Sequence, residues 1–200
     1  DLMPTGDIMR EQAVLTLPLR QWAAAEASSA VSELEQGKVL FLPELAFHLS
    51  EQEMPLLDPA LVDPKRKNIS YQPLSGKLTG VAVAERQQQV QQLLERYYQS
   101  CRQLIAGLLP EYQEALHHPT GSLRLHPVSA WRAASSWRKD DSRLHVDAFP
   151  SRPNYGERIL RIFTNINPHG EDRQWRVGEP FPELAERFMP RLARYSALSS

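Results

Sequence analysis

The sequence has only one cysteine, almost no net charge and no long hydrophobic run. With Cys101 as its single thiol, the chain cannot form an internal disulfide, which is compatible with a reducing compartment. A formal net charge of -1 gives no sign of nucleic-acid binding. The longest apolar run, residues 39–42, is far shorter than the roughly 20 residues that cross a bilayer. We therefore expect a globular protein whose association with any membrane is peripheral.

The N-terminal part of the chain is predicted to be mainly helical. Short apolar runs at residues 13–19 and 38–43 end at prolines and indicate strands. An amphipathic pattern between them predicts a helix over 21–36, so the unit is strand, helix, strand. A stronger pattern predicts a long scaffold helix over 85–109.

Residues 58–80 carry three prolines and two glycines without sustained periodicity, which predicts a long loop. Lys65, Arg66 and Lys67 are adjacent within it. Ammonium and guanidinium groups donate charge-assisted hydrogen bonds to phosphate and carboxylate oxygens. The triplet is therefore either a patch for anionic groups or a solvated charge run.

The C-terminal part alternates apolar and polar residues and indicates strands. We predict strands at residues 122–127, 143–149 and 158–167, with 173–177 pairing with the last across a turn. A further helix is expected from about Pro182. Helices followed by strands suggest an α+β fold, in which an antiparallel jelly-roll or cupin-like barrel packs against helices.

His145 and Asp147 lie on one of these predicted strands and point to a specific chemistry. Residues two apart on a strand project to the same side, so the imidazole and the carboxylate converge. Together they supply two of the three ligands of the 2-His-1-carboxylate triad in non-haem iron oxygenases. The alternative is a pair that is only hydrogen-bonded in a turn.

The sequence around this motif, residues 136–168, resembles the Kdo hydroxylase family, and so do residues 35–43 and 63–71. The resemblance implies a double-stranded β-helix and an Fe(II)- and 2-oxoglutarate-dependent dioxygenase. Such an enzyme uses O2 to hydroxylate C3 of 3-deoxy-D-manno-oct-2-ulosonic acid (Kdo), a sugar of the lipopolysaccharide inner core. The resemblance makes His145 and Asp147 the first two iron ligands.

The resemblance also implies one dioxygenase domain over residues 1–200, with the helical scaffold at 1–119 and a partial β-helix at 120–200. The family's triad takes its second histidine from a late strand, usually followed by an arginine for 2-oxoglutarate. Neither His169, on a predicted turn, nor His126, on a neighbouring strand, is selected for this role by its position. A β-helix of about eight strands needs more strands than follow residue 120, so we expect the rest to lie beyond residue 200.

An anionic sugar and an anionic cosubstrate both require guanidinium and amide groups near the motif. Strand alternation places Arg161, Phe163 and Asn165 on one face of the predicted strand and Leu160, Ile162 and Thr164 on the other. The first face either lines the pocket or is exposed to solvent. We assign Arg161 and Asn165 to the cosubstrate, and Arg152, Asn154 and residues 65–67 to the substrate.

The leading hypothesis is therefore a dioxygenase that hydroxylates the Kdo sugar of a lipid A or lipopolysaccharide precursor. Its cofactor would be Fe(II), with 2-oxoglutarate and O2 as cosubstrates. We expect it in the cytoplasm, peripheral on the inner face of the bacterial inner membrane, because a lipid-linked sugar lies at a surface rich in phosphates. The rival hypothesis is a β-barrel module with an incomplete metal site that binds anionic sugar without catalysis.

Overall fold

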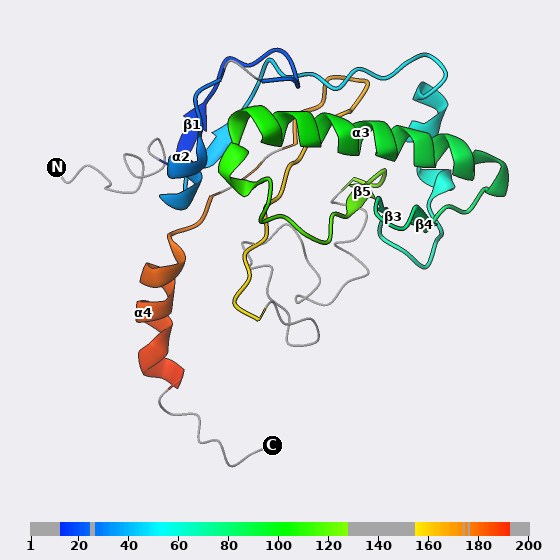
Figure 1. Cartoon of the computed structure of the whole chain (residues 1–200). Coiled ribbons are helices and arrows are strands. Elements are labelled where there is room, and N and C mark those ends of the chain that lie inside the picture. The colour runs from blue at the N-terminus through cyan, green and yellow to red at the C-terminus, as the bar shows by residue number, and fades with distance from the viewer. Residues whose placement is uncertain (1–12, 25–26, 128–154, 174, 176, 193–200) are drawn as a thin grey trace.

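The fold is taken from a computed structural model, which describes residues 13–24, 27–127, 155–173, 175 and 177–192. It mixes helices with short strands around one long helix, α3 (Figure 1). In chain order, the elements are β1 (Val14–Thr16), α2 (Val31–Glu35), β2 (Val39–Phe41), the 3-10 helices η1 (Met54–Leu57) and η2 (Pro59–Leu61), β3 (Ile69–Gln72), β4 (Lys77–Thr79), η3 (Ala84–Arg86), α3 (Gln87–Leu108), η4 (Pro110–Tyr112), β5 (Gly121–Leu123) and α4 (Phe181–Leu192).

Helix α3 confirms the predicted scaffold helix and organises two hydrophobic clusters. Its first half packs Val90, Leu93 and Leu94 against the sheet β4-β3-β5. Its second half packs Leu104 and Leu108 against the N-terminal unit. Burying each such side chain contributes on the order of 1.5–3 kcal/mol to the stability of the fold. The two clusters therefore hold the sheet and the N-terminal unit against the two halves of α3.

The N-terminal unit confirms the predicted strand, helix, strand order, because β1 and β2 pair in parallel with Val14 opposite Val39. The predicted helix over 21–36 is wrong in its length, since α2 begins only at Val31. Ahead of it the chain lies against α3, where Ala24 is buried. The Ala30 N–H donates to the Leu108 carbonyl over 2.9 Å. These contacts with α3 replace the hydrogen bonds that a longer helix would have made.

The predicted loop at residues 58–80 is wrong, because this segment contains η2 and a β-hairpin. β3 lies between β4 and β5 and is antiparallel to both. Ile69 and Tyr71 alternate inward into the core, a period of two that is too short to stand out among the prolines and glycines. Gly76 closes the hairpin turn at φ +66°, a conformation that favours glycine.

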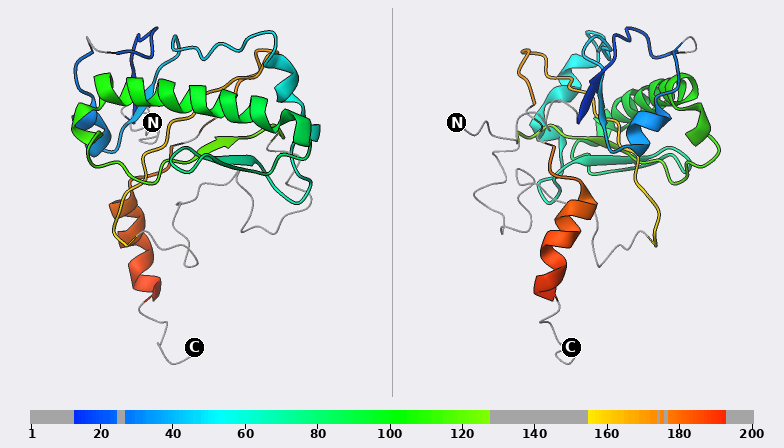
Figure 2. Two further views of the ribbon diagram at one scale, coloured as in Figure 1. Left: turned by 45° about the vertical axis from the view of Figure 1, so that its right-hand side comes forward. Right: turned by 90° about the vertical axis from the view of Figure 1, so that its left-hand side faces the viewer.

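Residues 158–167 are not a strand in the structure, although their faces alternate as predicted. Leu160 packs against the N-terminal cluster and Ile166 against the sheet cluster, so the segment runs beside α3 from one cluster to the other (Figures 1 and 2). The predicted strand at 122–127 is reduced to β5. No strand is assigned to the described residues of 173–177 either.

Helix α4 confirms the helix predicted near Pro182 and projects from the rest of the structure (Figures 1 and 2). None of the helices that the structure describes is long and apolar enough to span a membrane.

Candidate functional site

The two predicted iron ligands, His145 and Asp147, lie outside the described residues, as do Arg152 and Asn154. Among the residues that are described, no group of three or more histidines, cysteines, aspartates or glutamates is placed to hold a metal ion. The nearest described part of the chain after the motif is residues 155–173, 175 and 177, and the site is described from this segment.

The start of this segment is tied to α2 by an ion pair. Arg158 donates two hydrogen bonds of 2.7 Å to the carboxylate of Glu35, and the Tyr112 hydroxyl donates to the same carboxylate. These hydrogen bonds, from Arg158 first and then Tyr112, lower the pKa of Glu35. The bidentate geometry aligns the chain as it enters the stretch beside α3.

The middle of the segment is held by Tyr97 of α3. Its hydroxyl donates to the Ile162 carbonyl over 3.3 Å and shares a 3.0 Å hydrogen bond with the Thr164 hydroxyl. Burial raises the pKa of Tyr97, so the phenol stays protonated. Burial also raises the pKa of Cys101, one turn further on, to about 11, so its thiol stays protonated and unreactive at neutral pH.

The outer face of the segment carries Arg161, Phe163 and Asn165, all exposed. Phe163 meets Trp175 with ring centroids 4.4 Å apart, and the guanidinium of Arg173 lies 5.6 Å from the Trp175 ring centroid. The chain therefore reverses near His169 as predicted, although side-chain contacts replace a strand ladder.

Asparagines shape this reversal. The Asn165 amide donates to the Glu171 carbonyl over 2.8 Å, and its oxygen accepts from the Asn167 N–H. The Asn167 side-chain oxygen accepts from the His169 N–H over 2.8 Å. Both polar atoms of Asn165 are thus engaged in the turn, and His169 lies exposed at its tip.

The basic triplet, residues 65–67, lies in the turn that leads into β3. Asp63 holds this turn, because its side chain accepts from the Lys65 N–H and its carbonyl from the Arg66 N–H. Lys65 and Arg66 are exposed and Lys67 is half-buried. The turn packs closely against Gly80, directly after β4, so it lies against the hairpin of β3 and β4.

Both a known protein family and solved structures are similar to this chain. Residues 20–200 match the family described as 3-deoxy-D-manno-oct-2-ulosonic acid (Kdo) hydroxylase. The chain belongs to the Kdo hydroxylase family. Two solved structures of the Kdo hydroxylase KdoO, a non-heme Fe(II) α-ketoglutarate-dependent dioxygenase, are similar to it. The complex with cobalt(II) has a TM-score of 0.82 at 39% identity, over 94% of this chain and 64% of KdoO.

The KdoO complex with α-ketoglutarate and Fe(III) gives a TM-score of 0.80 at 38% identity, over 93% of this chain and 63% of KdoO. The chain thus spans somewhat less than two thirds of the KdoO chain. None of the curated proteins matches the sequence.

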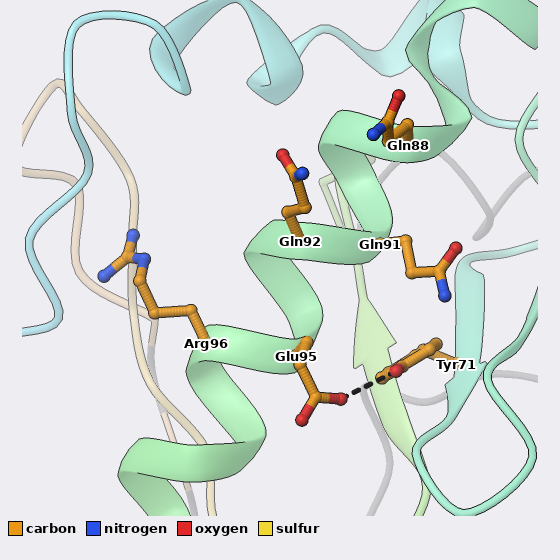
Figure 3. A pocket seen from close by; sticks show the side chains of 6 residues that line it. All are labelled: Tyr71, Gln88, Gln91, Gln92, Glu95 and Arg96. Atoms are coloured by element: carbon orange, nitrogen blue, oxygen red, sulfur yellow. Dashed lines mark hydrogen bonds between the residues drawn. The ribbon is translucent and has the colours of Figure 1, made fainter.

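A shallow pocket of about 510 Å³ lies on α3, lined by Tyr71, Gln88, Gln91, Gln92, Glu95 and Arg96 (Figure 3). The Tyr71 hydroxyl donates to Glu95 over 2.7 Å, which lowers the pKa of Glu95. Arg96 is engaged by Glu53 over 2.7 Å. Its lining holds no imidazole or thiol, and its charged groups are paired with Tyr71 and Glu53.

Sequence reasoning missed the contact between Phe163 and Trp175. The two residues are equidistant from His169 along the chain, so a hairpin centred there would have placed them opposite each other on one face. It also missed the hydrogen bonds of Tyr97, for which the sequence holds no signal because α3 and the segment are far apart in the chain.

Proposed function

We propose that this member of the Kdo hydroxylase family is an Fe(II)- and 2-oxoglutarate-dependent dioxygenase that hydroxylates C3 of a Kdo sugar. The observation that carries the proposal is the family match over residues 20–200. It is supported by the structural likeness to KdoO at 39% identity, a dioxygenase solved with cobalt(II), with α-ketoglutarate and with succinate.

We assign the metal to His145 and Asp147, because one imidazole and one carboxylate are the donor set that suits Fe(II). Iron bound together with 2-oxoglutarate would activate O2, so that one oxygen atom enters a C–H bond of the sugar as C–OH and the other enters succinate, which forms from 2-oxoglutarate with loss of CO2. The protein contributes the geometry of the site. Arg158 and Tyr97 fix the segment that follows the ligands, so its outer face is presented in one orientation.

We also propose that residues 1–200 belong to one dioxygenase domain whose fold is a double-stranded β-helix of the jelly-roll type. The antiparallel sheet β4-β3-β5 and the alternating faces of residues 158–167 are consistent with parts of such a barrel. In this arrangement α3 is the scaffold that covers the barrel.

For the anions we propose Arg161 as a partner of 2-oxoglutarate, since guanidinium binds carboxylate bidentately. Asn165 contributes by shaping the turn, because both of its polar atoms are engaged there. Arg152, Asn154 and the basic triplet at 65–67 would contact the substrate. The triplet's charges suit the phosphates of a lipid A or lipopolysaccharide precursor, held peripherally at the inner face of the inner membrane from the cytoplasmic side.

The direct experiment incubates the full chain with Kdo-lipid A, Fe(II), 2-oxoglutarate and O2, and follows succinate release. We expect release that depends on the sugar and is abolished in His145→Ala and Asp147→Ala. Leu74→Ala, an exposed change on the hairpin tip, is the control that keeps activity. Sugar binding without any succinate release would instead favour a binding module that lacks a complete metal site.

A further inference from the structure

An exposed aromatic pair occupies the outer face of the segment that follows the proposed iron ligands. Phe163 and Trp175 are 54% and 58% exposed, although their rings are in contact. Ile159 and Val177, which lie near the pair in the sequence, are also exposed. Exposed apolar side chains that contact one another can mark a binding site, whereas single exposed apolar side chains are ordinary.

The opposite face of the segment already provides its packing. Leu160 and Ile166 pack into the two clusters beside α3, and Thr164 bonds to Tyr97. The segment is therefore anchored without Phe163 and Trp175. Hydrogen bonds of the asparagine turn around His169 join the two stretches that carry these residues, and the two rings are in contact with each other.

Positive charge borders this surface. The Arg173 guanidinium lies 5.6 Å from the Trp175 ring centroid, and Arg161 precedes Phe163 on the same face. An aromatic surface edged by guanidinium groups matches a ligand with an apolar ring face and a carboxylate.

We propose that Phe163, Trp175 and Arg173 form the surface on which the sugar-acid ring of the substrate stacks. This inference rests on the proposed function and names the residues that recognise its substrate. By its chemical name, a 3-deoxy-octulosonic acid has a methylene at C3 and a carboxylate at C1. Its C–H groups pack on the two rings, and its carboxylate lies beside a guanidinium. 2-Oxoglutarate fits the rings less well, because it is a flexible dicarboxylate without a ring face.

The test titrates the full chain with the Kdo monosaccharide by calorimetry and compares matched variants. Trp175→Leu and Phe163→Leu are each expected to weaken Kdo binding about tenfold, as losing one well-packed aromatic contact does. Arg173→Gln should weaken it similarly by removing a charge-assisted contact. Phe41→Leu is the control, because Phe41 is 53% exposed on β2, outside this surface, and its loss should not change the affinity.

The outcomes separate the inference from the proposed function. If the wild type hydroxylates Kdo, and Trp175→Leu and Phe163→Leu bind Kdo as tightly as the wild type does, only the inference is overturned. Weakened binding in these variants, with no hydroxylation by the wild type, upholds the sugar surface and overturns the proposed reaction. If another part of the chain covers the rings, Trp175→Leu lowers the thermal unfolding midpoint and leaves the Kdo affinity unchanged, which also overturns the inference.

Discussion

Replacing Tyr97 by phenylalanine removes one hydroxyl from the contact between α3 and residues 158–167. The ring remains, and with it the edge-on contacts to Trp22 and Phe47 at centroid distances of 5.9 and 5.2 Å. The hydroxyl makes a 3.0 Å hydrogen bond with Thr164 and a longer one, 3.3 Å, with the Ile162 carbonyl. At about 0.5–1.5 kcal/mol for each bond, we expect a loss of about 1–2 kcal/mol in the free energy of unfolding.

Urea unfolding measures this loss, and hydrogen exchange of the peptide covering 158–167 locates it. We expect faster exchange in that peptide and little change in the sheet around β3. Tyr98→Phe is the matched control, expected within about 0.5 kcal/mol of wild type. Thr164→Val completes a double-mutant cycle whose coupling energy should be about 1 kcal/mol. A Tyr97→Phe protein with wild-type stability and wild-type exchange would refute the idea that Tyr97 anchors the segment.

Three further predictions concern stability and membrane binding. Gly107→Ala should lower the free energy of unfolding by about 1–3 kcal/mol, although alanine favours helices, because the added Cβ would lie 2.4 Å from the carbonyl atoms of Ala24. A gain in stability would contradict this close approach. The pKa of Glu35 is lowered from 4.5 by Arg158, so its stabilising contribution is present above about pH 4.5 and lost as the pH falls through the lower folded value. Glu35→Gln should therefore flatten the fall in urea midpoint between about pH 5 and pH 3. Changing the basic triplet at 65–67 to glutamine should weaken binding to anionic vesicles by roughly 1 kcal/mol per charge, as measured by co-sedimentation. Unchanged binding would argue against a membrane role.

The sequence predicts the parts of the fold that are set by local patterns. The long apolar repeat of α3 and the helix near Pro182 are visible in it because each spans several turns. The hairpin of β3 and β4 is not, because only Ile69 and Tyr71 alternate inward between the prolines and glycines. The shortened α2 has a different cause. Ala24 packs onto α3 and the Ala30 N–H donates to the Leu108 carbonyl, tertiary contacts that override helical propensity.

The site is predicted from the sequence in its chemistry more than in its geometry. The motif at His145 and Asp147 and the family resemblance point to iron chemistry, and membership of the family is confirmed. The contacts that orient the following segment are not predictable, since Glu35 and Tyr97 reach it from distant parts of the chain. The two faces of residues 158–167 are predictable from period two alone.

Isotopically labelled O2 tests directly whether the protein hydroxylates C3 of Kdo with an oxygen atom from O2. The full chain is incubated with Kdo-lipid A, Fe(II) and 2-oxoglutarate, and the released sugar is analysed by mass spectrometry. We expect one labelled oxygen atom at C3 of Kdo in the wild-type reaction and none with Asp147→Ala. An unmodified sugar, or a hydroxylated sugar whose new oxygen carries no label, would contradict it.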